Sequence, residues 1–253
     1  MPHRSAPPDA SQRFRVPADP MARFIEIYAA LEADRGFWED PTALRFAAIS
    51  MLTNRAPATA VAEGIRATAE ELRHRVGWFS ELRSPLRFIL SAMLLQAEDT
   101  PAAFLAEVDR VEKLFRAARL RRGHAFEKVA IFVLRNARDL RPVEPEDIAR
   151  FKAIYEQMKR YHWWLTGPDD FPACAMLVRR DGTPEEIGEG VERIYQALHE
   201  VGFTRGNPLQ TAANLLYLTG IEARAVAERM RAIADYLVRI GINIHPSEYD
   251  EIS

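Results

Sequence analysis

The sequence predicts an all-α protein built from repeated helical hairpins. Apolar residues recur at spacings of three and four along the chain, no segment alternates apolar and polar residues as a strand does, and one long segment matches a later one. These observations indicate an α-solenoid of the HEAT or armadillo type, or a helical bundle that arose from the same repeats by duplication.

Amphipathic helices are indicated near both ends of the chain. The spacing is clearest in two sets of apolar residues: Phe24, Ile27, Tyr28, Leu31, and then Val191, Ile194, Tyr195, Leu198. Since no hairpin turn separates alternating segments, we expect helix from about residue 20 to 240 and no sheet.

An internal repeat links residues 88–134 with residues 171–217. At an offset of 83, the two segments are identical at 11 of 47 positions. The matches include Phe88 with Phe171, Ala92-Met93-Leu94 with Ala175-Met176-Leu177, Thr100-Pro101 with Thr183-Pro184, and Arg122-Gly123 with Arg205-Gly206. The sequence therefore predicts that the two segments superpose.

Prolines predict where the long helices start. Long helices are expected at Pro57, Pro101, Pro145 and Pro184, because proline suits the first helical turn, where its missing N–H would be unpaired anyway. The spacings of these prolines are 44, 44 and 39 residues, and residues 135–141 form an extra connector. We expect six long helices alternating with five short ones.

Two of these prolines follow a threonine, Thr100 and Thr183. Threonine caps a helix N-terminus well, because its hydroxyl accepts a hydrogen bond from an otherwise unpaired N–H.

Composition places the chain among globular proteins. Lys and Arg total 34 and Asp and Glu total 36, a formal net charge of -2, which gives no overall attraction to nucleic acid or anionic lipid. Residues 1–17 carry no apolar stretch and are expected to be a disordered tail ahead of one helical domain, 18–253. The single Cys174 lies in an apolar run and is expected to be buried, so the sequence predicts a soluble, cytoplasmic protein with no disulfide and no membrane association.

Familiar catalytic motifs are missing from the sequence, including the phosphate loop, the dinucleotide fingerprint, the zinc-protease helix and the nucleophile elbow. Gly188 and Gly190 form a GxG, but inside the helix after Pro184 rather than after a strand. Close helix packing is the expected role of these glycines.

Two polar stretches contain the residues that could carry chemistry. Each stretch, 161–177 and 202–218, is expected to be the turn from a long helix into a short one, and both turns should lie on one edge of a solenoid. The candidate binding residues are His162, Asp169, Asp170, Arg205, Asn207 and Gln210. Carboxylates, an imidazole and carboxamides could bind a hard cation or perform acid–base chemistry, although no metal ligand set and no cofactor is assigned.

Structural roles compete for the same residues. One of Asp169 and Asp170 is expected to cap the helix that contains Cys174, which leaves the other free to face His162 or Asn207. His162 ends a helix, where its side chain suits the helix dipole. Trp163 and Trp164 fit core filling better than a base-stacking platform, and Gly206-Asn207 could supply only turn geometry.

The two polar stretches also resemble a bacterial family catalogued as a domain of unknown function, the one numbered four thousand and three. The resemblance rests on Met158-Lys159 with His162, Leu165-Thr166, Asp169-Asp170 and Ala175, and on Gly202-Phe203, Gly206-Asn207 and Leu209-Gln210. It covers the second half of the chain and implies a helical, bacterial, cytoplasmic protein. It implies no activity.

A local excess of positive charge runs from Arg110 to Arg141, with ten Lys or Arg against three Asp or Glu. The run could contact a polyanion, or its side chains could pair with acidic neighbours on a solvated face. The net charge of the whole chain argues against a nucleic-acid partner.

Three functions follow from these observations. The leading one is a protein- or ligand-binding scaffold, because helical repeats make extended surfaces. A metal-assisted or acid–base enzyme using His162, Asp169 and Asp170 is the first alternative. The second is a helical-repeat nucleic-acid binder, similar in general plan to the helical-repeat DNA glycosylases, that would hold phosphates with residues 116–141 and a base against Trp163 or Trp164.

Overall fold

The computed structural model describes residues 16–37, 39–77, 80–162 and 165–253. In these ranges the chain is helical and contains no strand, as predicted, from α2 at Pro20 to the end of α12 at Arg239. The expected disordered tail lies almost wholly outside the described residues, as do Trp163 and Trp164.

The chain divides into two compact units, Met1–Ala106 and Glu107–Ser253, and each is described by itself. The single domain expected over 18–253 stays a prediction. In the first unit the helices are α2 (Pro20–Ala33), α3 (Pro41–Ser50), α4 (Ala58–Arg75) and α5 (Leu86–Gln96), with a short 3₁₀ turn, η1 (Glu81–Arg83). Helix α6 (Pro101–Ala117) begins in the first unit and ends in the second.

The second unit continues the same alternation of helices. Its helices are α7 (His124–Asn136), α8 (Pro145–Tyr161), α9 (Phe171–Leu177), α10 (Pro184–Glu200), α11 (Asn207–Tyr217) and α12 (Ala223–Arg239), with 3₁₀ turns η2 (Pro168–Asp170) and η3 (Pro246–Glu248). The described residues therefore contain the six long and five short helices that the sequence predicted.

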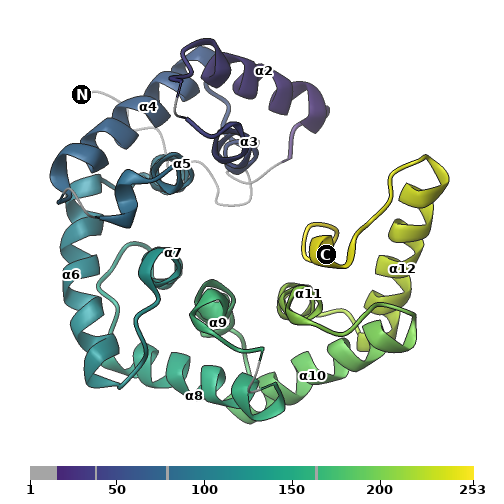
Figure 1. Cartoon of the computed structure of the whole chain (residues 1–253). Helices are drawn as coiled ribbons and strands as arrows, with labels where there is room; N and C mark the ends of the chain where they lie inside the picture. The colour runs from purple at the N-terminus through teal and green to yellow at the C-terminus, as the bar shows by residue number, and fades with distance from the viewer. Residues whose placement is uncertain (1–15, 38, 78–79, 163–164) are drawn as a thin grey trace, which may run out of the picture. The chain divides into compact units, whose positions relative to one another are not determined.

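In the second unit the long and short helices form separate layers (Figure 1). Each of the long helices α8, α10 and α12 packs on the next, and the short helices α7, α9 and α11 do the same. Within the first unit α2 packs on α4 and α3 packs on α5.

Proline and threonine set the helix starts much as predicted. Pro101, Pro145 and Pro184 are the first residues of α6, α8 and α10. Thr183 accepts from Glu186 N at 3.2 Å and Thr100 accepts from Ala103 N at 3.2 Å. These bonds satisfy N–H groups that a helix start leaves unpaired.

The start of α4 differs by one residue from the prediction. Pro57 is the N-cap of this helix, with an extended ψ of 144°, and the helical backbone begins at Ala58.

Apolar faces of the helices fill each core. In the first unit Ile27, Leu31, Leu44, Met51 and Ile65 have no exposed surface. In the second unit Phe171 packs edge-on against the rings of Phe115, Phe151 and Tyr155, at centroid distances of 5.9, 5.3 and 5.2 Å. These ring contacts fix the first residue of α9, and so the turn that precedes it.

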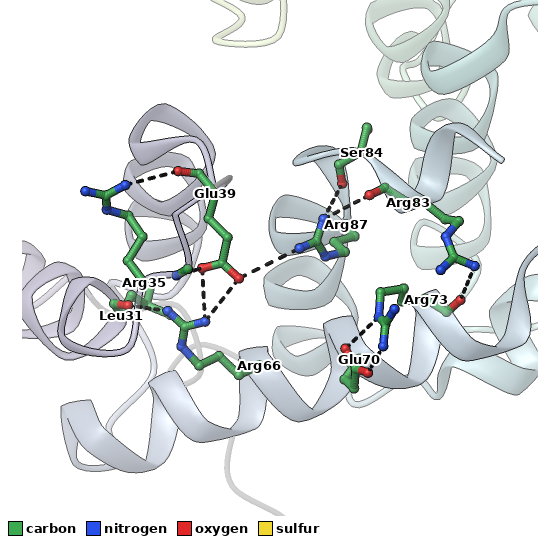
Figure 2. A network of polar contacts seen from close by, with 10 residues as sticks. Leu31, Arg35, Glu39, Arg66, Glu70, Arg73, Arg83, Ser84 and Arg87 are labelled. Atoms are coloured by element: carbon green, nitrogen blue, oxygen red, sulfur yellow. Dashed lines mark hydrogen bonds and ion pairs between the residues drawn. The ribbon is translucent and has the colours of Figure 1, made fainter. Parts of the chain in front are cut away.

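A polar network braces the first unit (Figure 2). Glu39, between α2 and α3, accepts from Arg66 of α4 at 3.1 Å and lies 3.8 Å from Arg87 of α5. Arg66 also donates to the carbonyl of Leu31 at the end of α2. Because one carboxylate joins side chains from α4 and α5, the network ties three segments of this unit together.

Glycines in α10 permit close packing in the second unit, as expected for the GxG. A Cβ on Gly188 would lie 2.9 Å from Gln157 Cβ of α8. A Cβ on Gly190 would meet the ring of Tyr217 in α11. Among the helices of the described ranges, none has both the length and the apolar character needed to cross a bilayer.

Candidate functional site

The two polar stretches form the α8–α9 and α10–α11 turns of the second unit. Helix α8 ends at its C-cap, His162, whose N–H donates to Met158 O. Helix α10 ends where Gly202, at φ 99°, donates to His199 O and Phe203 N donates to Leu198 O. A left-handed glycine suits this kind of helix end because it lacks a Cβ.

Two hydrogen bonds connect the turns directly. Asn207 Nδ2 donates to Asp169 Oδ2 at 3.0 Å, across 38 residues of sequence. Gln210 Nε2 donates to Thr166 Oγ1 at 3.0 Å, across 44 residues. Asp169 is exposed, whereas Thr166 and Gln210 are buried, so the contact between the turns extends from the surface into the core.

Asp170 corrects the expectation that a carboxylate caps the helix containing Cys174. Asp170 occupies the N-cap position of α9 but makes no side-chain bond into that helix. Its Oδ2 accepts from Gly167 N at 3.0 Å, within η2. The reason is the η2 turn, which gives Asp170 a helical backbone (φ -80°, ψ -3°), whereas a capping residue needs an extended one.

The two carboxylates lie around Gly167. A Cβ on Gly167 would collide with Asp169 Oδ1, and Asp170 accepts from the Gly167 N–H. Burial of Asp170, which is 3% exposed, raises its pKa to about 7; Asp169 adds to the rise and the bond from Gly167 opposes it.

His162 belongs to a second chain of contacts. His162 Nε2 lies 2.7 Å from Glu192 Oε2, and the imidazole centroid lies 4.3 Å from that of Tyr195. Glu192 Oε1 accepts from Gln196, whose own oxygen accepts from Arg205 Nη2 at 2.9 Å. His162 and Arg205 are therefore joined to each other through α10.

The six candidates thus fall into two groups. Asp169, Asp170, Asn207 and Gln210 lie around Thr166 and Gly167, while His162 and Arg205 lie at opposite ends of the Glu192–Gln196 chain. Over the described ranges, no three His, Cys, Asp or Glu side chains gather as a metal site would require. His162 does not come together with Asp169 and Asp170, because its Nε2 contacts Glu192 instead.

Carboxamides of α11 leave polar atoms unsatisfied. Asn207 Oδ1, Gln210 Oε1 and both polar atoms of Asn214 are buried without a hydrogen-bond partner among the described residues. Gln210 and Asn214 are each 1% exposed. Buried polar groups are nearly always paired, so these four unpaired atoms on one helix call for an explanation.

Two further side chains were not foreseen from the sequence. Glu192 lies inside a long helix with nothing local to distinguish it from a solvated carboxylate. Asn214 could have been noticed, because Asn207, Gln210 and Asn214 share one face of an otherwise apolar helix at helical spacing.

Cys174 is completely buried, as expected, and its Sγ lies 3.1 Å from Met158 Sδ. Burial raises the pKa of the Cys174 thiol well above its ordinary value. The thiol therefore has neither the exposure nor the thiolate character of a reactive cysteine.

Within the second unit, several residues of the basic run from Arg110 to Arg141 are paired with acidic side chains. Its ion pairs include Arg110–Glu107, Arg116–Glu127, Lys128–Glu112 and Arg138–Asp147. These pairs agree with the interpretation that the Lys and Arg side chains of the run pair with acidic neighbours on a solvated face.

Comparisons with known proteins identify the family of the chain. A family model described as "Protein of unknown function (DUF4003)" matches residues 27–253, so the match extends well before the two polar stretches. A similar curated protein is the uncharacterized protein YeaA of Bacillus subtilis (strain 168), 25% identical over 152 residues, which are 58% of this chain and 44% of that protein. The matched region thus spans less than half of that relative's length, and no solved structure matches the chain. Because the family model covers most of its length, the chain belongs to the DUF4003 family.

Proposed function

We propose that this chain is a helical-repeat binding protein whose binding site is the contact between the α8–α9 and α10–α11 turns. The observation that carries the proposal is the row of unsatisfied carboxamide atoms on α11, next to the carboxylates of Asp169 and Asp170. Burying polar atoms without partners costs free energy. A ligand that supplies the missing partners accounts for their presence.

A repeat architecture is part of this proposal. Helix α12 matches α10 at an offset of 39 residues: Gly241, at φ 88°, corresponds to Gly202, and Ile242 N donates to Leu237 O as Phe203 N donates to Leu198 O. Equivalent helix ends with equivalent bonds support one repeating unit.

The same comparison explains the exposed apolar residues of α12. Ile194 and Phe203 are buried, whereas their equivalents Ile233 and Ile242 are 47% and 49% exposed. Phe203, just after α10, is covered by Tyr249, whose ring lies 4.9 Å from its own. Ile233 and Ile242 lack such cover among the described residues.

A recurring arginine contact also supports the repeat. Arg150 of α8 donates to the carbonyls of Val178, Arg180 and Gly182, in the connection that leads to α10. In the first unit, Arg23 of α2 donates to Asn54 and Ala56 in the connection that leads to α4. In each unit a long helix thus holds the loop before the next long helix.

Thermal melting with a panel of small ligands tests the binding function. The panel holds metal salts, amines, amino acids, nucleotides and sugar phosphates, and a ligand that binds the folded state raises the melting temperature. We expect at least one class to do so for the natural chain and not for Asn207→Ala. Asn136→Ala, at an exposed position of the same unit, is the control. A panel without any shift, or a shift that Asn207→Ala retains, contradicts the proposal.

An acid–base enzyme is the second candidate, and Asp170 favours it. A carboxyl group with a pKa of about 7 can exchange protons near neutral pH, as a general acid or base must. Incubating the same panel with the protein and following it by NMR separates the two functions. An enzyme consumes a compound, and Asp170→Asn stops the consumption, whereas a binding protein leaves every compound intact.

Cellular context completes the proposal. A single buried cysteine suits a reducing compartment, and the similar protein named above is bacterial. We therefore place the protein in the bacterial cytoplasm, with a small ligand or a protein as its partner rather than a nucleic acid or a membrane.

A further inference from the structure

The atoms left over at the contact between the turns are mostly oxygens. Asn207 Nδ2 donates to Asp169, and Gln210 Nε2 donates to Thr166. The unpaired atoms of these two residues are therefore Asn207 Oδ1 and Gln210 Oε1, both hydrogen-bond acceptors. The amide N–H groups of these two side chains are therefore bonded within the protein, whereas their amide oxygens can still accept from or coordinate a ligand.

The same place holds uncompensated negative charge. Asp169 and Asp170 both lie against Gly167, and neither makes an ion pair with a described residue. Arg205, the basic residue among the six candidates, donates to Gln196 instead. Two neighbouring carboxylates repel one another, and a bound cation offsets that repulsion.

The buried amide lies beside these carboxylates. Thr166, which holds the Gln210 amide, directly precedes Gly167, whose N–H donates to Asp170. Gln210, whose unpaired Oε1 belongs to a side chain that is 1% exposed, therefore reaches the same turn as the two carboxylates through Thr166. Asp169 at the exposed end gives an approach from solvent.

We propose that the carboxylates of Asp169 and Asp170, with the carboxamide oxygens of Asn207 and Gln210, bind a small hard divalent cation of the Ca²⁺ or Mg²⁺ type. Such cations take carboxylate and amide oxygens together with water, and they need neither His nor Cys. Two carboxylates balance the charge of one divalent ion. This inference rests on the proposed binding function and names the ligand class of the same site.

Melting of chelator-treated protein tests the proposal. Millimolar CaCl₂ or MgCl₂ is added, and NaCl of equal ionic strength is the reference. We expect one divalent ion to raise the melting temperature by about 2 to 4 °C at concentrations well above its dissociation constant. Calorimetric titration should give one ion per chain.

Variants assign the shift to this site. Asp169→Asn and Gln210→Met should abolish it, and Asp181→Asn, an exposed carboxylate of the same unit, should retain it. Since Asp169 is exposed, Asp169→Asn keeps the test valid if Gln210→Met fails to fold. The proposal is overturned if neither ion exceeds the NaCl reference, or if Asp169→Asn keeps the shift. Stabilisation by an organic compound of the panel but by no divalent ion also overturns it, while leaving the binding function in place.

Discussion

Asn207 donates its side-chain N–H to the carboxylate of Asp169 at 3.0 Å, and so links two turns that are 38 residues apart. The bond is solvent-exposed, so a double-mutant cycle of Asp169→Ala and Asn207→Ala should give a coupling free energy of about 0.5 to 1 kcal/mol. Urea unfolding of the two single variants and the double variant measures it. A coupling energy of zero would show that the two side chains do not stabilise one another.

Asp170 should make stability depend on pH in a direction unusual for a carboxylate. Its pKa of about 7 in the folded state exceeds the ordinary value of 3.8, so between pH 4 and 7 the folded protein keeps a proton that the unfolded chain has lost. Stability from this group is therefore full below about pH 4 and falls until about pH 7. Asp170→Asn removes the effect, because a neutral amide oxygen can still accept from Gly167.

The comparison of unfolding curves at pH 5, 6, 7 and 8 checks this prediction in chelator-treated protein. Between pH 5 and pH 8 the variant should gain about 3 kcal/mol of stability over the natural chain, since each pKa unit corresponds to 1.36 kcal/mol and about two units of the shift lie above pH 5. A difference that does not change with pH would mean that the carboxyl group titrates normally.

Gly188 should resist substitution more than Gly64 does. A Cβ on Gly188 would lie 2.9 Å from Gln157 Cβ, which cannot move without the backbone of α8, so α8 and α10 must separate. A Cβ on Gly64 would meet only the end of the flexible Leu95 side chain. Gly188→Ala should cost about 1 to 2 kcal/mol despite the better helix propensity of alanine, and Gly64→Ala about zero. Equal melting temperatures for the two variants would argue against close packing at Gly188.

Arg150 should stabilise the connection into α10. Its guanidinium donates to three carbonyl groups at 2.7 to 2.8 Å, and Arg150→Met removes all three bonds while keeping the length of the side chain. We expect a loss of about 1 to 2 kcal/mol, because the carbonyls regain only part of their hydrogen bonding from water. Arg160→Met, at an exposed position of the same helix, is the matched control. If both variants unfold at the same urea concentration, the contact does not contribute to stability.

Residues 110–141 should give only weak, salt-sensitive binding to DNA or RNA. Several of their cationic groups are already paired with carboxylates, which leaves fewer of them for phosphates. A gel-shift assay at physiological salt checks this, and submicromolar binding would restore the nucleic-acid function.

Local sequence patterns were sufficient to predict the helices. Pro145 and Pro184 mark helix starts, and Thr183 caps one of them, because the chemistry of a helix start depends only on neighbouring residues. The contact between Asp169 and Asn207 was also among the expectations, since turns at equivalent places in a repeat lie on the same edge.

The rest of the site depends on geometry that single residues do not encode. Whether His162 faces Asp169 or Glu192 depends on how α8 and α10 are rotated against one another, which follows from packing along both helices. The expectation that a carboxylate caps α9 was wrong because the 3₁₀ turn before that helix, set by Pro168 and the buried Phe171, changed the backbone of Asp170.

Asn214 allows the most direct test of the claim that α11 carries a binding site. Both polar atoms of its carboxamide are buried and unpaired, and leucine has nearly the same shape. If the amide is kept for a ligand, Asn214→Leu should be at least as stable as the natural chain in ligand-free buffer, because it removes a desolvated polar group without opening a cavity. A loss of about 2 kcal/mol or more in urea unfolding would show that the amide supports the fold itself, and would contradict the account of this face as a site.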